Sequence, residues 1–445
     1  MYREALLGDT SELALSYISS MDEDRELVGE VIEALLTHLR ELKEAGLISG
    51  EKAEAIGAEL RKLLNDPSPL FEVSAEDVHE AIEALLRERL GSIEGYLPLG
   101  KSRNDHVSAA LRLKTKRLLR EQLRELLKLR FVLIERAEKF INVPMPAFTH
   151  LQPAQPSTFA HYLLSIEEGL ADYTEALQTT LGIADRSPLG AGAVAGTSVP
   201  LDRERLGKAL FSGTVVNSIY ATSSRDFLAI ACSIDASLSV FISRIAEDFV
   251  VFSTPNFDYI ELPNEHLATS SMMPQKRNPA TMEVARAWGG EAIGHLTALL
   301  AVLKGLPTGY NLDMQEANKH AFRILNGTLE TLRILRDVLS KVRPKEKSML
   351  RDSEVFPIMA TDVAERIAVS TGRPYRKVYS EVAGMIRESG SVEEFYGKVK
   401  ERYGLEVSLD EGLAKPVLGS PNPEKVREAI ELARKRLVRD SKAVG

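Results

Sequence analysis

The chain has 445 residues, 44% of them hydrophobic, and a formal net charge of −8. A chain of this length can hold about two to four domains and bury a large core. It contains no tract of clustered Lys or Arg, which excludes the electrostatic footprint of a nucleic-acid-binding protein. We therefore expect a globular protein that acts on small molecules and binds no nucleic acid.

The first helices are expected within the first hundred residues. Apolar residues recur with helical spacing at 28–46 and again at about 51–64. Before a third helix, Ser74 and Asp77 resemble a capping box, and Gly91 falls where a left-handed cap would end that helix. This part of the chain is predicted to form a small helical domain.

The middle of the chain predicts unusually long helices. Residues 105–143 contain no Gly or Pro, and as one helix they would extend more than about 50 Å. Few monomeric domains could cover such a rod, so we expect an elongated bundle in an oligomer. Similar patterns occur at about 158–184, 225–252, 280–303 and 316–342.

The segment 225–252 is apolar over much of its circumference but carries Asp235 and Arg244. A buried helix of an oligomer therefore fits it better than a membrane span. The single cysteine, Cys232, lies in this segment and is read as a buried small hydrophobe. The first 15 residues carry acidic residues where a signal peptide needs an apolar core. We expect a cytoplasmic protein that does not associate with a membrane.

Beyond residue 350 the pattern shortens into modest helices near 357–371, 374–388 and 423–438. No run alternates convincingly with period two, and no repeat of fixed length recurs, so neither a sheet nor a solenoid is favoured. The fold class is therefore all-α. The expected domains are an N-terminal helical domain at 1–100, a central long-helix bundle at 101–350 and a small C-terminal helical domain at 351–445.

Chemistry is expected in the polar connectors between the long helices, because rigid rods hold their ends in fixed relation. In PLGKSRNDHVS the residues Ser102, Asn104 and Asp105 could simply cap the following helix, or they could join Arg103 in binding a carboxylate. In THLQPAQP, His150 precedes two prolines that prevent a helix start before about Ser157.

Two further connectors are unusual in composition. SPLGAGAVAGTSVP is Gly-rich, but no Lys-Ser/Thr pair follows it, so we interpret it as a tight backbone loop rather than a phosphate cradle. SSMMPQKRNP combines small residues with Lys276 and Asn278 just before a helix that starts near Pro279. Such a loop could close over an anionic substrate, although a plain surface loop is the rival interpretation.

SSMMPQKRNP resembles the signature of the fumarase/aspartase superfamily. Within that superfamily, SRNDHV, THLQPAQP, PLGAGAVAGTSVPLDRE and YNLDMQE are similar to the argininosuccinate lyases. The resemblance implies three helical domains and a homotetramer whose active sites are shared between subunits. It also implies an amidine lyase of arginine biosynthesis, which eliminates fumarate from L-argininosuccinate reversibly to give L-arginine, with no metal or other cofactor.

The resemblance also assigns residues to roles. Ser270 matches the residue that abstracts the proton, His150 its partner acid or relay, and Glu283 the carboxylate that charges the histidine. Lys276, together with Asn278, matches the residues that hold the substrate carboxylate. The implied substrate-binding residues are Ser20, Asp24, Ser102, Arg103, Asn104, Thr149, Asn278, Tyr310, Gln315 and Asn318.

Some positions depart from the family pattern. Thr269 stands where the signature has Gly, which removes backbone freedom from a loop that is expected to move. Asn318 stands where many relatives carry Lys, with Lys319 one residue later. Adenylosuccinate lyase or another fumarate-releasing lyase of the superfamily is the alternative function, and a crystallin-like structural protein is a remote one.

Overall fold

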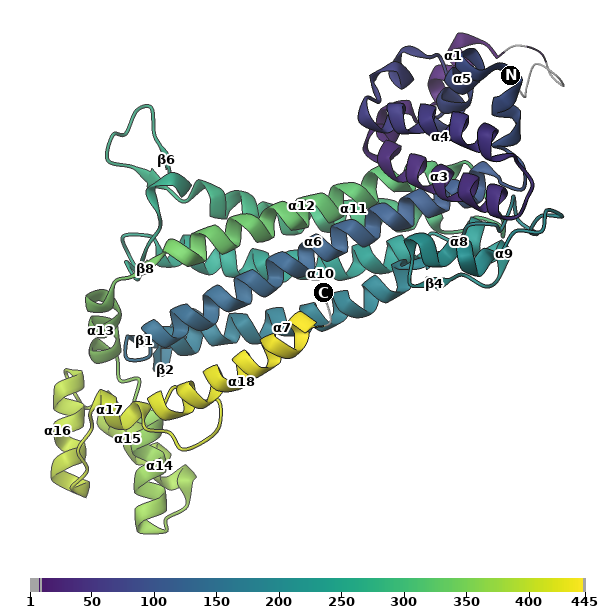
Figure 1. Cartoon of the computed structure of the whole chain (residues 1–445). Helices are drawn as coiled ribbons and strands as arrows, with labels where there is room; N and C mark the ends of the chain where they lie inside the picture. The colour runs from purple at the N-terminus through teal and green to yellow at the C-terminus, as the bar shows by residue number, and fades with distance from the viewer. Residues whose placement is uncertain (1–7, 9, 443–445) are drawn as a thin grey trace. The chain divides into compact units, whose positions relative to one another are not determined.

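The computed structural model describes residues 8 and 10–442 (Figure 1). Part of the N-terminal stretch in which no signal peptide is expected lies outside these residues. The chain divides into two compact units. The first unit comprises Met1–Glu121, Ala176–Ser237 and Glu291–Leu329, and the second comprises Gln122–Glu175, Leu238–Gly290 and Glu330–Gly445. The division into three domains stays a prediction.

The long helices predicted from the sequence are confirmed. Within the described residues, five helices have 24 or more residues, and each contributes to both units. Their ends lie within about four residues of the predicted ones, which is close to the usual uncertainty of helix boundaries. They are α6 (Arg103–Lys139), α7 (Phe159–Ala184), α10 (Asp226–Phe252), α11 (Ala280–Leu303) and α12 (Asp313–Lys341).

Buried side chains lock these helices together in each unit. In the first unit, Cys232 is buried as expected, with its Sγ 3.8 Å from the Ala321 carbonyl oxygen. In the second, the fully buried Arg130 donates hydrogen bonds of 2.8 Å to both Glu167 and Asp440. Because the loss of one partner would leave an uncompensated buried charge, these contacts fix the packing of α6 and α7 against the C-terminal helix.

Helix α10 is the one described helix that is long and apolar enough, by length and composition, to cross a membrane. Half of its most apolar window is buried within the protein. It carries the fully buried Asp235 and Ser239, and Ser239 Oγ accepts a 3.0 Å hydrogen bond from Trp288 of α11. These contacts are those of a helix in a protein core.

The rest of the first unit consists of short helices and one two-stranded parallel sheet. The predicted capping box is wrong by three residues: Asp77 is the N-cap of α5 and accepts from Glu80 N at 2.8 Å, while Glu80 accepts from Glu76 N. Ser74 is not part of this cap. The elements are α1 (Glu12–Ile18), α2 (Met21–Asp24), α3 (Val28–Glu44), α4 (Gly50–Asn65), α5 (Val78–Leu90), α8 (Arg203–Leu210), α9 (Ser218–Ser223), β3 (Arg186–Ser187) and β4 (Gly213–Thr214), with 3-10 turns at Arg25–Leu27, Ser68–Glu72 and Gly91–Tyr96.

The second unit adds short hairpins and the C-terminal helices. The longest hairpin pairs β1 with β2 and lies beside α13 (Figure 1). Helices α14, α15 and α18 were expected, whereas α13, α16 and the short α17 were not. The elements are β1 (Pro144–Thr149), β2 (Gln152–Thr158), β5 (Ile260–Glu261), β6 (Ala268–Thr269), β7 (Arg277–Asn278), β8 (Arg343–Pro344), α13 (Glu346–Val355), α14 (Ala360–Thr371), α15 (Tyr375–Arg387), α16 (Val392–Tyr403), α17 (Leu409–Leu413) and α18 (Pro423–Lys442), with a 3-10 turn at Asn264–His266.

Candidate active site

The residues at the start of α6 cap that helix. Ser102 Oγ accepts a hydrogen bond from Asn104 N at 3.2 Å, and Asp105 Oδ1 accepts one from Ser102 N at 2.9 Å. The capping interpretation is therefore correct for Ser102 and Asp105. The Asn104 side chain has another role, because it donates to the Ala193 carbonyl at 3.1 Å.

Asp105 also fastens the Gly-rich loop to α6. This carboxylate is fully buried, and its Oδ2 accepts from Gly192 N at 3.1 Å. Gly192 has φ 64°, and a Cβ there would clash with the Gly196 carbonyl, so the loop requires glycine. Burial raises the pKa of Asp105 to about 6, although the amides of Ser102 and Gly192 act to lower it. The prediction of a tight backbone loop is confirmed.

Arg103 reaches the start of α5. Its Nη1 lies 3.0 Å from Asp77 Oδ2 and 3.6 Å from Glu76 Oε2. The sequence reasoning missed both carboxylates as part of the site. The sequence did contain a signal, because two acidic residues stand immediately before α5 and an N-cap needs only one. Asp77 Oδ1 alone caps the helix by accepting from Glu80 N.

Ser20 and Asp24 form a polar pair at the first turn of α2. Ser20 is the N-cap residue, but its hydroxyl donates to Asp24 Oδ2 at 2.9 Å instead of accepting from a helix amide. The same oxygen accepts from Val78 N at 3.1 Å. Burial raises the pKa of Asp24 to about 6, and the bonds from Val78 and Ser20 oppose the rise. The pair therefore holds a carboxyl group that can change charge near neutrality.

Tyr310 lies within electrostatic reach of these carboxylates. Its phenol pKa is raised, first by burial, and then by Asp77, Glu76 and Asp24, while Arg225 lowers it. This links the loop before α12 to the residues around Ser20 and Arg103.

Gln315 and Asn318 follow on the first turns of α12. Gln315 Nε2 donates to the Ile18 carbonyl at 3.0 Å, which ties α12 to the segment before Ser20. Asn318 is 9% exposed, and its Oδ1 has no hydrogen-bond partner in the described part of the chain. Lys319 is exposed and pairs with Glu316 at 2.5 Å. Asn318, and not Lys319, thus occupies the buried face of this helix.

His150 lies at the tip of the β1–β2 hairpin. His150 and Leu151 form its two-residue turn, with φ of 54° and 57°, both in the left-handed region. Prolines along both strands prevent a helix here, and Phe148 packs on Phe252 with ring centroids 6.2 Å apart. A short turn anchored by a half-buried ring holds the exposed Thr149 and His150 in a defined place.

Ser270 begins a loop that joins β6 to β7. Its Oγ accepts hydrogen bonds from Met272 N at 3.3 Å and Met273 N at 3.0 Å. Two amide donors on one hydroxyl oxygen favour negative charge there. Thr269 is paired with Arg277 in the hairpin and is not among the described residues with positive φ, so the replacement of glycine carries no backbone strain in this conformation.

The other predicted residues of this loop are accessible. Lys276 and Glu283 are exposed, and Asn278 is half-buried. In the described part of the chain the side chains of Lys276 and Asn278 make no hydrogen bond or ion pair, so both are available to a ligand. The base of the loop is held by Thr281 Oγ1, which donates to the His266 carbonyl at 3.2 Å.

The predicted residues thus form two groups. The first group comprises Ser20, Asp24, Arg103, Asn104, Tyr310, Gln315 and Asn318, all of which lie in the first unit. The second group, in the second unit, comprises Thr149, His150, Ser270, Lys276, Asn278 and Glu283. Within the described residues there is no cluster of three or more His, Cys, Asp or Glu side chains that could hold a metal ion.

Comparison with known proteins identifies the family. Residues 7–294 match the model of a lyase family. The chain is 58% identical over 442 residues to the argininosuccinate lyase of Pyrococcus furiosus, which covers 99% of this chain and 96% of that protein. The chain belongs to the argininosuccinate lyase family. Another argininosuccinate lyase, from Sulfolobus acidocaldarius, is 40% identical over 432 residues, or 97% of this chain and 92% of that one.

A solved structure supports the fold assignment. The crystal structure of EDDS lyase in complex with formate superposes with a TM-score of 0.82, at 24% sequence identity, over 94% of this chain and 88% of that one. At this identity the likeness concerns the fold alone. The expected fold, all-α and of the fumarase/aspartase type, is confirmed for this argininosuccinate lyase family member.

Proposed function

We propose that this protein is an argininosuccinate lyase that catalyses the reversible elimination of L-argininosuccinate to L-arginine and fumarate, a step of arginine biosynthesis. The observation that carries the proposal is the 58% identity to an argininosuccinate lyase over nearly the whole of both chains. The enzyme class is that of carbon–nitrogen lyases. The reaction requires no metal or organic cofactor in this proposal.

The chemistry determines what the site must supply. Loss of the proton beside a carboxylate moves charge onto a group that is already anionic, so the intermediate is a dianion-like aci-carboxylate. Preorganised cations and donors must stabilise that charge. Lys276 and Asn278 are assigned to this role because a cation and an amide stand together, unpaired in the described chain and accessible, at the start of α11.

Ser270 is assigned as the base. A serine hydroxyl is a poor base unless its alkoxide is stabilised, and the amides of Met272 and Met273 already donate to its Oγ. Loop closure over the substrate would remove water and strengthen these interactions. His150 is assigned as the partner acid or relay, with Glu283 as the carboxylate that charges it.

The first group, with Ser102 and Thr149, is assigned to substrate recognition. Arg103 suits a substrate carboxylate, because a guanidinium can form two parallel hydrogen bonds to it. Asp24 and its neighbour Asp77 suit a cationic part such as the guanidinium of the arginine moiety. The buried, unpartnered Oδ1 of Asn318 supplies an acceptor where a family lysine would supply a cation.

Members of this family are typically oligomeric, and we assign a homotetramer whose active sites combine residues of different subunits. Exposed apolar side chains along α10 and α11 support an oligomer, since water-exposed apolar patches of this kind usually mark contacts between chains. They are Ile230, Val240, Val284, Ile293 and Leu300, between 38% and 71% exposed. The proposed location is the cytoplasm, where metabolic lyases of this kind act on soluble substrates.

The experiment is a fumarate absorbance assay of the purified protein with argininosuccinate and, separately, with adenylosuccinate. We expect turnover of argininosuccinate and none of adenylosuccinate. Turnover of adenylosuccinate alone would transfer the assignment to the alternative lyase. No turnover of either by a correctly assembled protein would leave the crystallin-like structural role.

A further inference from the structure

Two arginines of the first unit are buried without an acidic partner. Arg112 is 0% exposed and Arg225 is 2% exposed, and neither has a carboxylate within ion-pair distance in the described part of the chain. Arg112 Nη1 donates to the Ile183 carbonyl at 3.0 Å, and its guanidinium lies 4.1 Å from the centroid of the Phe227 ring. Neutral carbonyls and a ring face compensate a buried cation only in part.

Polar atoms of both guanidinium groups remain unused. Nε and Nη2 of Arg112 and Nε of Arg225 are buried and have no hydrogen-bond partner among the described residues. Burial, with help from Arg186 and Arg225, lowers the pKa of Arg112 to about 9, although Tyr220 and Asp226 act to raise it. Burial likewise lowers the pKa of Arg225 to about 10. This region of the protein interior therefore carries an excess of positive charge.

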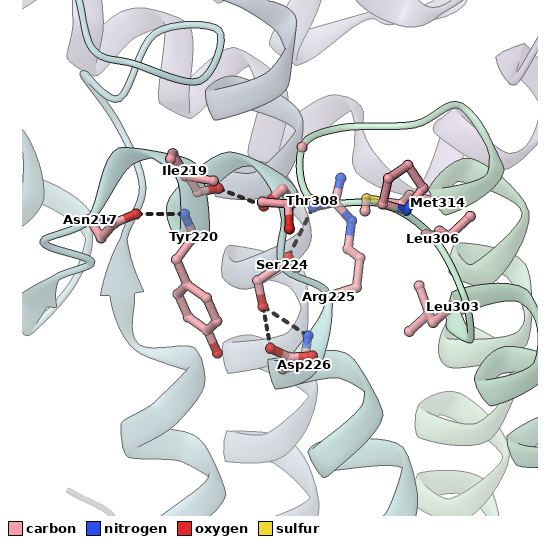
Figure 2. A pocket seen from close by; sticks show the side chains of 13 residues that line it. Asn217, Ile219, Tyr220, Ser224, Arg225, Asp226, Leu303, Leu306, Thr308 and Met314 are labelled. Carbon is pink, nitrogen blue, oxygen red and sulfur yellow. Dashed lines mark hydrogen bonds between the residues drawn. The ribbon is translucent and has the colours of Figure 1, made fainter.

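Arg225 lines a pocket with a volume of about 380 Å³ between the start of α10 and the loop before α12 (Figure 2). Its Nη1 donates to the Ser224 carbonyl at 3.1 Å, which leaves the remainder of the planar group facing the loop that carries Thr308. Asp226 lines the pocket too, but its Oδ2 already accepts from Ser224 Oγ at 2.9 Å. Among the described residues, no ion pair joins this carboxylate to Arg225.

We infer that this pocket binds a small oxyanion, a carboxylate or a phosphate, through the guanidinium of Arg225. A guanidinium matches the two oxygens of such a group, and the hydroxyl of Thr308 at the pocket wall can donate a further hydrogen bond. Apolar residues, among them Leu303, Leu306 and Met314, form the remainder of the wall and admit a small organic anion.

The site adjoins the substrate-recognition residues but does not depend on the proposed function. Arg225 already acts on the Tyr310 phenol, and the pocket wall at Leu306, Pro307, Thr308 and Gly309 is the segment that leads to it. An anion bound to Arg225 would cancel part of the positive field that lowers the pKa of Tyr310. Because a ligand stabilises the folded state that binds it, occupancy should raise the stability of the protein.

The test measures binding directly on the full-length protein. Sodium acetate and sodium phosphate are titrated separately at constant ionic strength, with acetamide as a neutral control, and the heat of binding and the melting temperature are recorded. We expect saturable binding of at least one of the two anions and none of acetamide. Arg225→Met should weaken that binding about ten-fold or more, the loss expected for charge-assisted hydrogen bonds.

Matched variants separate this site from general salt effects and from misfolding. Arg323→Met removes a surface arginine that pairs with Glu291 and should bind the anion as the parent does. Thr308→Glu brings a tethered carboxylate to the pocket, so it should abolish binding and raise the melting temperature, whereas Thr308→Gln should do neither. If Arg225→Met does not fold, the comparison of Thr308→Glu with Thr308→Gln tests the inference instead.

Two results would overturn the inference. One is the absence of saturable binding of both anions to the parent protein, as would follow if an acidic group of another copy of the chain neutralised Arg225. The other is equal binding by the parent and by Thr308→Glu. Which anion binds more tightly distinguishes a carboxylate site from a phosphate site.

Discussion

Replacing Asp24 by Asn should remove a stability penalty that depends on pH. The folded pKa of about 6 exceeds the ordinary value of 3.8 because of burial. The folded protein therefore holds this proton more tightly than the unfolded chain, and stability falls as the pH rises from about 4 to about 7. At about 1.36 kcal/mol for each tenfold change in proton affinity, the penalty at neutral pH is about 3 kcal/mol at most.

The expected change in melting temperature follows from the size of the chain. An unfolding entropy of about 2.1 cal/mol/K per residue gives about 0.9 kcal/mol/K for the whole chain, so about 3 kcal/mol corresponds to about 3 °C. The melting temperature of Asp24→Asn minus that of the parent should therefore rise by about 3 °C between about pH 4 and about pH 8. The amide oxygen of Asn can still accept from Ser20 or Val78, so the fold is retained.

The assay is circular dichroism melting of both proteins across this pH range. Asp22→Asn is the control, because the Asp22 side chain is 94% exposed and its removal should give a difference that does not vary with pH. A flat difference for Asp24→Asn as well would refute the claim that burial dominates this carboxyl group.

Four further outcomes are expected. Ser270→Ala should lower kcat by about 10²-fold to 10⁴-fold or more while size-exclusion chromatography shows an unchanged assembly, and near-normal turnover would disprove the base assignment. Inactive Ser270→Ala and His150→Asn proteins, mixed in equal amounts after dissociation, should regain activity in up to about one quarter of the sites. The reason is that each site then takes Ser270 and His150 from different subunits at random. Verified hybrids without activity would argue against shared sites. Arg103→Met should raise KM about ten-fold or more with a smaller change in kcat, as steady-state kinetics can determine. Thr269→Gly should leave kcat within about two-fold, since Thr269 has no strained φ, and a large gain would show that the threonine restrains loop closure.

The sequence predicted the long helices well because their apolar residues repeat over many turns without Gly or Pro, so the period is unambiguous. It failed for the β1–β2 hairpin, where prolines conceal any alternation of apolar and polar residues, and the strands are stabilised by Phe148 packing on a distant aromatic cluster. The capping box was predicted three residues too early because Ser74 and Asp77 both suit an N-cap. Only the position at which α5 begins decides between them.

The candidate site was predictable as separate motifs but not as a network. Arg103 was visible in SRND, yet its contacts with Asp77 and Glu76 depend on how α5 packs near the start of α6. The raised pKa of Asp24 likewise comes from burial, which no local pattern encodes. Arg225 is the first residue of the predicted helix 225–252, and its lack of an acidic partner among the described residues becomes visible only in three dimensions.

The turn at His150 and Leu151 restricts which amino acids this position can accept. Gly adopts the left-handed backbone conformation without strain, and Asn, Asp and His adopt it more often than other residues do. A β-branched residue would be strained in this turn. In the role proposed for His150, position 150 must therefore supply both this backbone shape and a group that transfers a proton. Most substitutions at position 150 would lose both the turn conformation and the imidazole. Asparagine is the replacement that removes the imidazole and keeps the left-handed turn.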